Sequence, residues 1–228
     1  LFQLAAEIAM DPPGSLDADD LQSARETVIR CFRSIDPKEV VLGQYDGYRK
    51  VDGIADDSTT DTFVAARIWV DNERWHGVPF LLRTGKRMAE SHQTVSLLLK
   101  DPEGPIDGLP TDGNVLTFQL SGDGAVAVEF VVKRPGPGLT LETGTADLPL
   151  GEVTDAEPLP PYARLIQGVL LGDRALFTRP DGLADVWKVA TPLLDNPPKL
   201  QPYKQGSWGP AAAAKLAAPD RWLLGQDD

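Results

Sequence analysis

Apolar residues recur at helical spacing in the first part of the chain. The pattern predicts a helix over about residues 1–10 that ends at the turn residues DPPG, positions 11–14. A second helix is predicted over Ala18–Arg33, with Ser15 or Asp17 as its capping residue. The apolar stripes are Leu1, Leu4, Ala5 and Ile8 in the first helix and Leu21, Ala24, Val28, Cys31 and Phe32 in the second.

The middle of the chain is patterned as β-strands. Strands are expected at Thr60–Val70, Thr94–Lys100, 114–120, Ala125–Lys133 and from Leu139 onward. The turn sequences SGDG and RPGPG separate the later runs, and such short connections predict an antiparallel meander. The run at 60–70 is apolar on both sides, which predicts at least partial burial of both its faces.

Helical patterning returns in the last third of the chain. The predicted helices carry the stripes Tyr162, Leu165, Ile166, Val169 and Leu170, then Leu183, Val186 and Trp187, followed by an alanine-rich helix at 209–218. Loops between them are expected to carry Pro192, Pro197, Pro198 and Pro202. We therefore predict an α+β fold, with a large, mostly antiparallel sheet of five or six strands and helices packed on one face. The other face is expected to be solvated or buried by a partner, and residues 1–228 are expected to form a single domain.

Composition narrows the functional classes. The net charge of −12 disfavours nucleic-acid binding, because an acidic surface repels phosphate backbones. With one cysteine, Cys31, and two histidines, His76 and His92, we expect no metal site, and Cys31 is interpreted as a buried small apolar residue. No apolar run approaches the ~20 residues of a membrane helix, and no signal peptide is recognised, so a cytoplasmic protein is expected. A first helix without a cap suggests that upstream sequence is missing.

One basic cluster stands out in this acidic chain. The segment RTGKRM places Arg83, Lys86 and Arg87 after an apolar, strand-like run. Lys86 at the edge of a sheet can reach an anion as a point charge, with Arg83 and Arg87 assisting. The alternative is that all three are solvated or salt-bridged surface residues. His92 is either a general base or an ordinary exposed histidine, and no dinucleotide, P-loop or GxSxG motif is present.

Several longer words of the sequence resemble one enzyme family. The stretch TTDTFVAARIWVDNERWHGVPFLLRTGKRM (59–88) resembles the C-terminal domain of glucose-6-phosphate dehydrogenase. Further matching words follow the family order over nearly the whole chain: LFQLAAEIAMDPP at the start, VLGQYDGY (41–48), LGDRALFTRPD (171–181) and YKQGSWGP (203–210).

The resemblance implies an oxidoreductase that converts D-glucose 6-phosphate to 6-phospho-D-glucono-1,5-lactone with NADP, the first step of the oxidative pentose phosphate pathway. It also implies that an N-terminal Rossmann domain binds NADP. The family's GxxGDLA nucleotide turn, its DHYLGKE-type phosphate-binding segment and its general-base histidine are not in this sequence. We therefore expect no catalytic and no cofactor-binding residue in this chain, a fragment that is inactive alone, and no metal.

The family's RTGK lysine contacts the substrate, and the matching residue here is Lys86. The resemblance thus implies that the cluster is basic because it faces a phosphorylated sugar. Five positions later the family commonly has a second basic ligand, whereas this chain has Ser91 followed by His92. That departure leaves open weaker substrate binding, substitution by His92, or another sugar phosphate.

The resemblance further implies a homodimer formed through the open face of the sheet. A second interpretation stays open, in which the chain is a non-catalytic homologue that keeps only the dimer-forming sheet as a regulatory module. The intact RTGK motif, which contains Lys86, favours the enzyme interpretation, whereas Ser91 favours the non-catalytic module.

Overall fold

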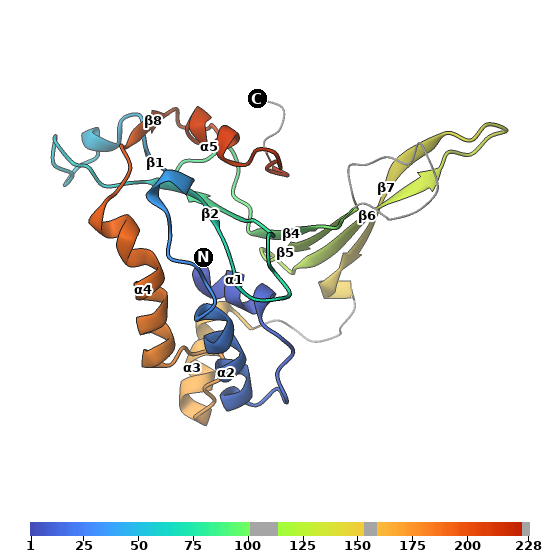
Figure 1. Ribbon diagram of the computed structural model, residues 1–228, viewed down its shortest axis with the longest axis horizontal. Helices are drawn as coiled ribbons and strands as arrows, with labels where there is room; N and C mark the ends of the chain where they lie inside the picture. Colours follow the sequence, from blue (N-terminus) through green and yellow to red (C-terminus); the bar gives the residue numbers. More distant parts are fainter. Residues whose placement is uncertain (101–113, 153–158, 225–228) are drawn as a thin grey trace. The chain divides into compact units, whose positions relative to one another are not determined.

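The computed structural model describes residues 1–100, 114–152 and 159–224 (Figure 1). The chain forms two compact units, one of Leu1–Glu90 with Pro160–Asp228 and one of Ser91–Leu159. The described helices are α1 (Phe2–Ala9), α2 (Ala18–Ile29), α3 (Pro161–Leu171), α4 (Pro180–Asp195) and α5 (Ala211–Leu216), with 3₁₀ turns η1 (Pro37–Glu39), η2 (Tyr48–Lys50) and η3 (Leu150–Glu152). Within these ranges, no helix combines the length and apolarity needed to cross a bilayer.

The first unit contains a four-stranded sheet in the order β3-β2-β1-β8. Its strands are β1 (Val40–Tyr45), β2 (Phe63–Ile68), β3 (Phe80–Gly85) and β8 (Gln201–Tyr203). β1, β2 and β3 pair antiparallel, whereas β8 lies parallel to β1. The sequence pattern did not predict β1 or β8, since Gly43 interrupts the first and the second is only three residues long with a central proline.

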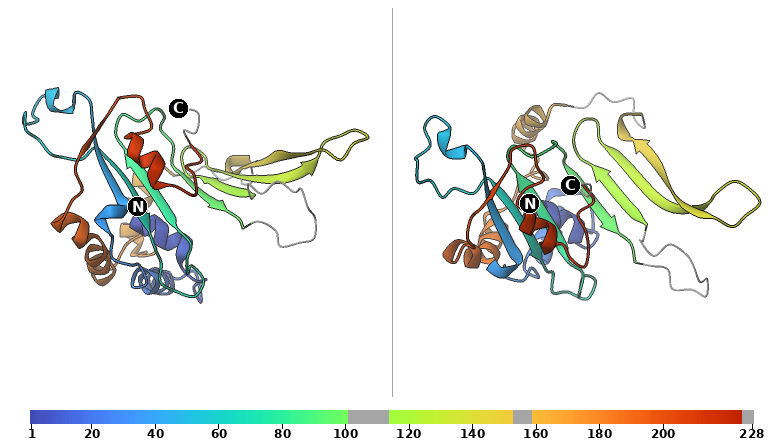
Figure 2. Two further views of the ribbon diagram at one scale, coloured as in Figure 1. Left: turned by 45° about the horizontal axis from the view of Figure 1, so that its top comes forward. Right: turned by 90° about the horizontal axis from the view of Figure 1, so that it is seen from above.

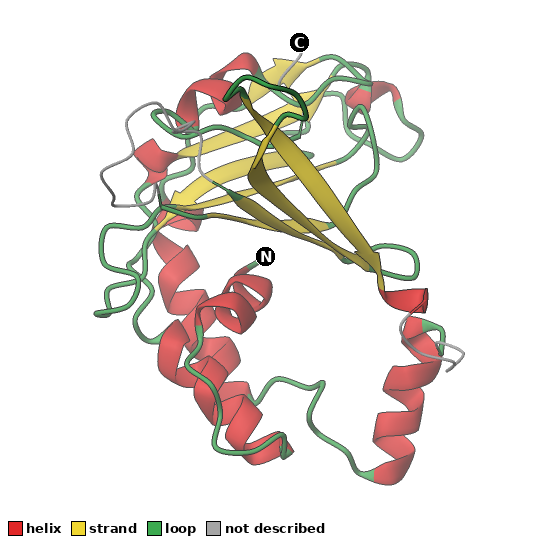
Figure 3. Cartoon of the chain, turned by 90° about the vertical axis from the view of Figure 1, so that its right-hand side faces the viewer, coloured by secondary structure: helices red, strands yellow, loops and turns green. Residues whose placement is uncertain are grey.

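Both faces of this first sheet are covered within its own unit. Alanines of α1 and apolar residues of α2 and α4 form one core with β1 and β2. The cartoon in Figure 3 distinguishes the helices, in red, from the strands, in yellow. On the opposite face, α5 and Tyr203 pack on Val41, Phe63 and Ala65. Figure 2 shows α5, in red, lying over the strands. The predicted burial of β2 on both sides is confirmed, while the prediction that helices cover one face was wrong for this sheet because α5 covers the other.

Tertiary contacts move the ends of two predicted helices. α2 ends at Ile29, earlier than predicted, because Phe32 forms a β-bridge with Val70. Asp17 holds the N-cap position of α2 but makes no side-chain capping hydrogen bond. α4 continues to Asp195 with Pro192 inside its last turn, so the assignment of Pro192 to a loop was wrong. A proline has no backbone N–H, so in the last turn it removes only one main-chain hydrogen bond and the helix can continue to its end.

The second unit is an antiparallel meander of β4 (Thr94–Leu98), β5 (Val115–Gln119), β6 (Ala125–Lys133) and β7 (Leu141–Pro149). The α+β class and the mainly antiparallel pairing are thus confirmed, but the described strands form two sheets of four where one sheet of five or six was expected. The strand registers place one apolar set of side chains on the same face of this sheet. These residues are Val95, Leu97, Leu116, Phe118, Val126, Val128, Phe130 and Leu148, and we call them the meander face.

Candidate functional site

Lys86 directly follows the end of strand β3. In the antiparallel ladder Gly85 lies opposite Phe63, the first residue of β2. The Lys86 main-chain N–H continues this pairing and donates to the Thr62 carbonyl at 2.8 Å. The Lys86 side chain is exposed, so its backbone belongs to the ladder while its ammonium group faces solvent. The predicted position of Lys86 at the end of a strand is therefore confirmed.

The glycine of the RTGK word is required by close packing. A Cβ atom on Gly85 would lie 2.8 Å from both Phe63 Cδ2 and Met88 Sδ. After Lys86, the backbone of Arg87 adopts a φ of 53°, a left-handed conformation that costs free energy for a residue other than glycine. A tight turn thus follows the strand and presents Lys86 at its start.

The three basic residues have different environments. Within the described part of the chain, neither Lys86 nor Arg87 forms an ion pair, and both are exposed. Arg83 instead lies between two indole rings, with its guanidinium carbon 5.0 Å from the Trp208 ring centroid and 4.6 Å from that of Trp222. Burial lowers the Arg83 pKa below its ordinary value, and the side chain donates to the Leu224 carbonyl at 2.9 Å. The expectation that Arg83 assists Lys86 is thus replaced by a packing role.

The other candidate residues lie outside the Lys86 turn, residues 86–89. Ser91 and His92 belong to the second unit, and both are exposed. His76 is exposed in the turn that precedes β3. Cys31 packs against the apolar core of the first unit, as expected of a small apolar residue, but it is half-buried and not buried as predicted. In residues 1–100, 114–152 and 159–224, no three His, Cys, Asp or Glu side chains converge as a metal site would require.

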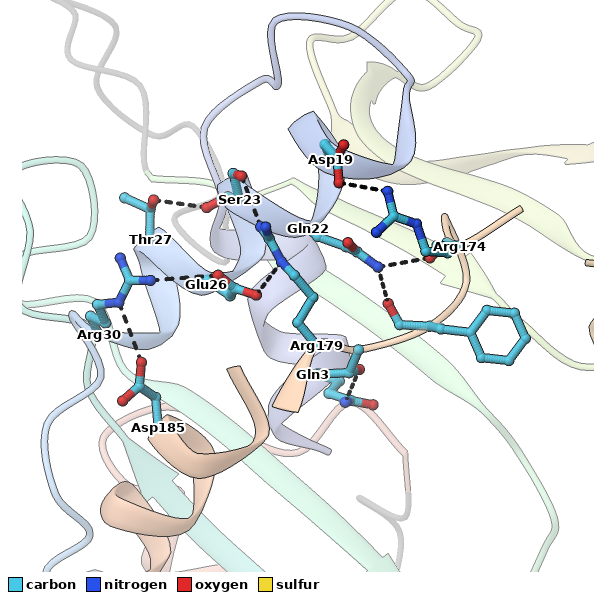
Figure 4. A network of polar contacts seen from close by, with 12 residues as sticks. Gln3, Asp19, Gln22, Ser23, Glu26, Thr27, Arg30, Arg174, Arg179 and Asp185 are labelled. Carbon is cyan, nitrogen blue, oxygen red and sulfur yellow. Dashed lines mark hydrogen bonds and ion pairs between the residues drawn. The ribbon is translucent and has the colours of Figure 1, made fainter. Parts of the chain in front are cut away.

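The word LGDRALFTRPD forms a structural network with α2 (Figure 4). The buried Gln22 amide donates to the carbonyls of Arg174 and Phe177 at 2.8 and 2.7 Å. The Arg179 guanidinium donates to the buried Glu26 carboxylate at 2.7 Å. These bonds attach the segment between α3 and α4 to α2 within the first unit, so this family-like sequence motif has a structural role.

The chemistry available at Lys86 is recognition of an anion. An ammonium group is a compact point charge with three donors. Because no carboxylate neutralises it in the described residues, a phosphoryl group would meet an unpaired positive charge in a chain whose net charge is −12.

Comparison with known proteins finds related sequences over almost the whole chain. The family model described as "Glucose-6-phosphate dehydrogenase, C-terminal domain" matches residues 1–223. Glucose-6-phosphate 1-dehydrogenase 1 of Mycobacterium tuberculosis (strain CDC 1551 / Oshkosh) is 36% identical over 226 residues, covering 95% of this chain and 46% of the relative. An Arabidopsis thaliana relative, "Glucose-6-phosphate 1-dehydrogenase 5, cytoplasmic", is 36% identical over 224 residues, covering 95% of this chain and 43% of its own length.

Solved structures show the same likeness. The crystal structure of glucose-6-phosphate 1-dehydrogenase from Mycobacterium avium superposes with a TM-score of 0.85 at 35% identity, covering 97% of this chain and 48% of that protein. A glucose-6-phosphate dehydrogenase in complex with its substrate glucose 6-phosphate gives a TM-score of 0.87 at 28% identity, covering 98% and 49%. The chain therefore spans about half the length of the relatives that it matches. The chain belongs to the glucose-6-phosphate dehydrogenase family and corresponds to its C-terminal domain.

Proposed function

We propose that this chain is the substrate-side and subunit-interface part of an NADP-dependent glucose-6-phosphate dehydrogenase. The observation that carries the proposal is the exposed Lys86 ammonium, which has no carboxylate partner in the described residues and follows a strand whose backbone holds its position. Membership of the family and likeness to a dehydrogenase solved with glucose 6-phosphate support it. Both units, residues 1–228, serve in this proposal as one C-terminal domain.

The role of Lys86 is to bind the sugar phosphate. A charge-assisted hydrogen bond from the ammonium to the substrate stabilises both the bound substrate and the transition state. Residue Lys86 is thus a binding residue, and it takes no proton or hydride in the reaction. Ser91, followed by His92, stands where the family commonly has a second basic ligand, so Lys86 carries a larger share of the binding charge.

NADP is the hydride acceptor in this proposal, and an N-terminal Rossmann domain of the parent protein binds it. This chain's sequence contains no glycine-rich nucleotide turn that would provide such a site. The general base that removes the proton of the sugar hydroxyl belongs to the same N-terminal part. The isolated chain is therefore expected to form no NADPH.

The parent protein forms a homodimer through the meander face. Val128 and Phe130, on strand β6 of this face, are 39% and 38% exposed. A contiguous exposed apolar surface of this kind typically marks a protein–protein interface. A second copy of the chain is the partner proposed, in a cytoplasmic enzyme.

The test is an NADPH absorbance assay with glucose 6-phosphate on the whole protein that carries this chain. We expect activity in the whole protein and a rise in KM for glucose 6-phosphate in a Lys86→Met variant. An Arg87→Met variant is the matched control, because Arg87 is the neighbouring exposed cation of the same turn. A whole protein that dimerises but forms no NADPH would instead be a non-catalytic interaction module.

A further inference from the structure

The turn that carries Lys86 is held by a segment from the opposite end of the chain. The Gly206 N–H donates to the Arg87 carbonyl at 2.8 Å, and the Ala89 N–H donates to the Ser207 carbonyl at 2.9 Å. Met88 forms a parallel β-bridge with Ser207 between these two bonds. Residues 203–207 thus run beside residues 86–89 and fix the left-handed backbone at Arg87.

Tyr203 contacts Lys86 itself. Its hydroxyl donates to the Lys86 carbonyl at 2.7 Å and lies 3.1 Å from the Thr62 hydroxyl and 3.2 Å from the Thr62 carbonyl. The Lys86 N–H donates to the same Thr62 carbonyl. One phenol group therefore joins the start of β2 to the peptide unit that follows Lys86.

The Tyr203 ring cannot move freely. The residue is only 4% exposed, and its ring packs against Phe63 at a centroid distance of 5.5 Å and against Tyr45 at 6.4 Å. Tyr203 is also paired in the sheet, parallel to Tyr45 of β1. A side chain held by both packing and sheet pairing gives its hydroxyl a fixed position.

We propose that Tyr203 is a positioning residue for Lys86, an inference that rests on the proposed binding of sugar phosphate by Lys86. A lysine side chain is flexible, so the position of its ammonium group depends on how firmly its backbone is held. Tyr203 holds the Lys86 carbonyl and Thr62 holds its N–H, so only the side chain is left to be ordered by the substrate. Such pre-organisation lowers the entropic cost of binding.

The test is a Tyr203→Phe variant of the whole enzyme, which keeps the ring and removes the hydroxyl. The loss of one hydrogen bond predicts a rise of about threefold to tenfold in KM for glucose 6-phosphate. The KM for NADP is expected to stay unchanged, because Tyr203 acts only through Lys86. In a Lys86→Met background the same substitution is expected to cause no further rise, since the residue that it positions is absent.

A Val41→Ala variant is the matched control for lost stability. Val41 belongs to the same apolar cluster as Tyr203 and Phe63, but it has no hydrogen bond to the Lys86 turn. We expect Val41→Ala to lower the free energy of unfolding and leave KM for glucose 6-phosphate unchanged. An equal KM rise in Val41→Ala, or an additive effect of Tyr203→Phe in the Lys86→Met background, would overturn the inference.

A second variant addresses the same turn if Tyr203→Phe does not fold. The Ser207 hydroxyl donates to the Lys204 carbonyl at 2.7 Å and stabilises the turn that presents the Ser207 carbonyl to Ala89. A Ser207→Ala variant is expected to raise KM for glucose 6-phosphate in the same direction, and an unchanged KM would count against the inference. An unchanged KM in Lys86→Met would overturn the proposed function of Lys86, whereas a change in Lys86→Met without one in Tyr203→Phe would overturn this inference alone.

Discussion

The guanidinium carbon of Arg83 lies 4.6 Å from the ring centroid of Trp222, although the two residues are far apart in the sequence. Trp208 lies at 5.0 Å from the same carbon. Arg83 thereby joins strand β3 to the C-terminal segment that follows α5. The arginine of the RTGK word stabilises the domain, and the lysine three positions later is the residue that faces solvent.

An Arg83→Lys variant is expected to destabilise the domain. The planar guanidinium of arginine can stack on indole rings, whereas the compact ammonium group of lysine cannot. The loss of two cation–π contacts and one hydrogen bond is expected to lower the free energy of unfolding by about 1–3 kcal/mol. Urea denaturation measures this change, and limited proteolysis near Trp222 reports whether the C-terminal segment loosens. Arg87→Lys, at an exposed residue, is the control, and an equal effect in both variants would contradict the packing role of Arg83.

A Gly209→Ala variant is expected to disrupt the packing around Phe63. Gly209 has a φ of 106°, and a Cβ atom there would lie 2.3 Å from Phe63 Cε2. Gly206→Ala is the matched control, since its φ is 77° but no atom lies within 4 Å of the added Cβ. We expect a loss of about 1 kcal/mol for Gly206→Ala and of about 3 kcal/mol or more for Gly209→Ala, measured by thermal unfolding. Similar losses would show that Phe63 yields to the added methyl group.

A Glu26→Gln variant is expected to weaken the attachment of α2 to the segment before α4. The Glu26 carboxylate is buried and accepts from Arg179 at 2.7 Å, with Arg30 at 3.5 Å. Removing its charge leaves the Arg179 guanidinium without its carboxylate partner, which is expected to cost about 1–3 kcal/mol of unfolding free energy. Asp71→Asn is the control, because the Asp71–Arg33 pair is exposed and is expected to contribute little. Chemical denaturation measures the unfolding free energy of both variants. An equal loss in the two would contradict the expectation that the buried ion pair contributes more than the exposed one.

Stability above about pH 10 is expected to depend on Tyr203. Burial raises the pKa of the Tyr203 hydroxyl above its ordinary value of 10.0. The unfolded chain therefore loses this proton first, so the stabilisation is fully present below the unfolded pKa and is lost as pH rises through the folded pKa. Wild type is expected to lose more stability than Tyr203→Phe between about pH 8 and about pH 11, measured by urea midpoints. Equal losses in the two proteins would show that the hydroxyl ionises as it does in water.

A Phe130→Lys variant is expected to weaken the proposed homodimer. Phe130 lies on the meander face, where a desolvated charge would oppose association. Thr145→Lys is the control on the opposite face, where Thr145 lies across from Glu129. Light scattering of the whole protein at several concentrations is expected to show more monomer for Phe130→Lys alone. A dimer that persists in this variant would place the interface elsewhere.

Local periodicity predicted the elements that depend on neighbours in the sequence. Strand β6 has the same bounds as its apolar alternating run, Ala125–Lys133, and α3 covers the predicted stripe. The pattern was insufficient where a residue's environment is set by distant segments. β1 contains Gly43 because Pro210 and Tyr203 approach its backbone closely, and a glycine inside a short run reads as a break in a strand.

The sequence by itself determined the family and singled out Lys86, because both depend on motifs of contiguous residues. Only the tertiary structure decided that Arg83 lies between two tryptophans, whereas the Lys86 ammonium has no carboxylate partner among the described residues. It also decided that Tyr203 donates to the Lys86 carbonyl. Tyr203 and Lys86 are 117 positions apart, and Arg83 and Leu224 are 141 apart. The parallel pairing of β8 with β1 brings Tyr203 into the sheet that carries Lys86. A local pattern of apolar and polar residues does not predict such a long-range pairing.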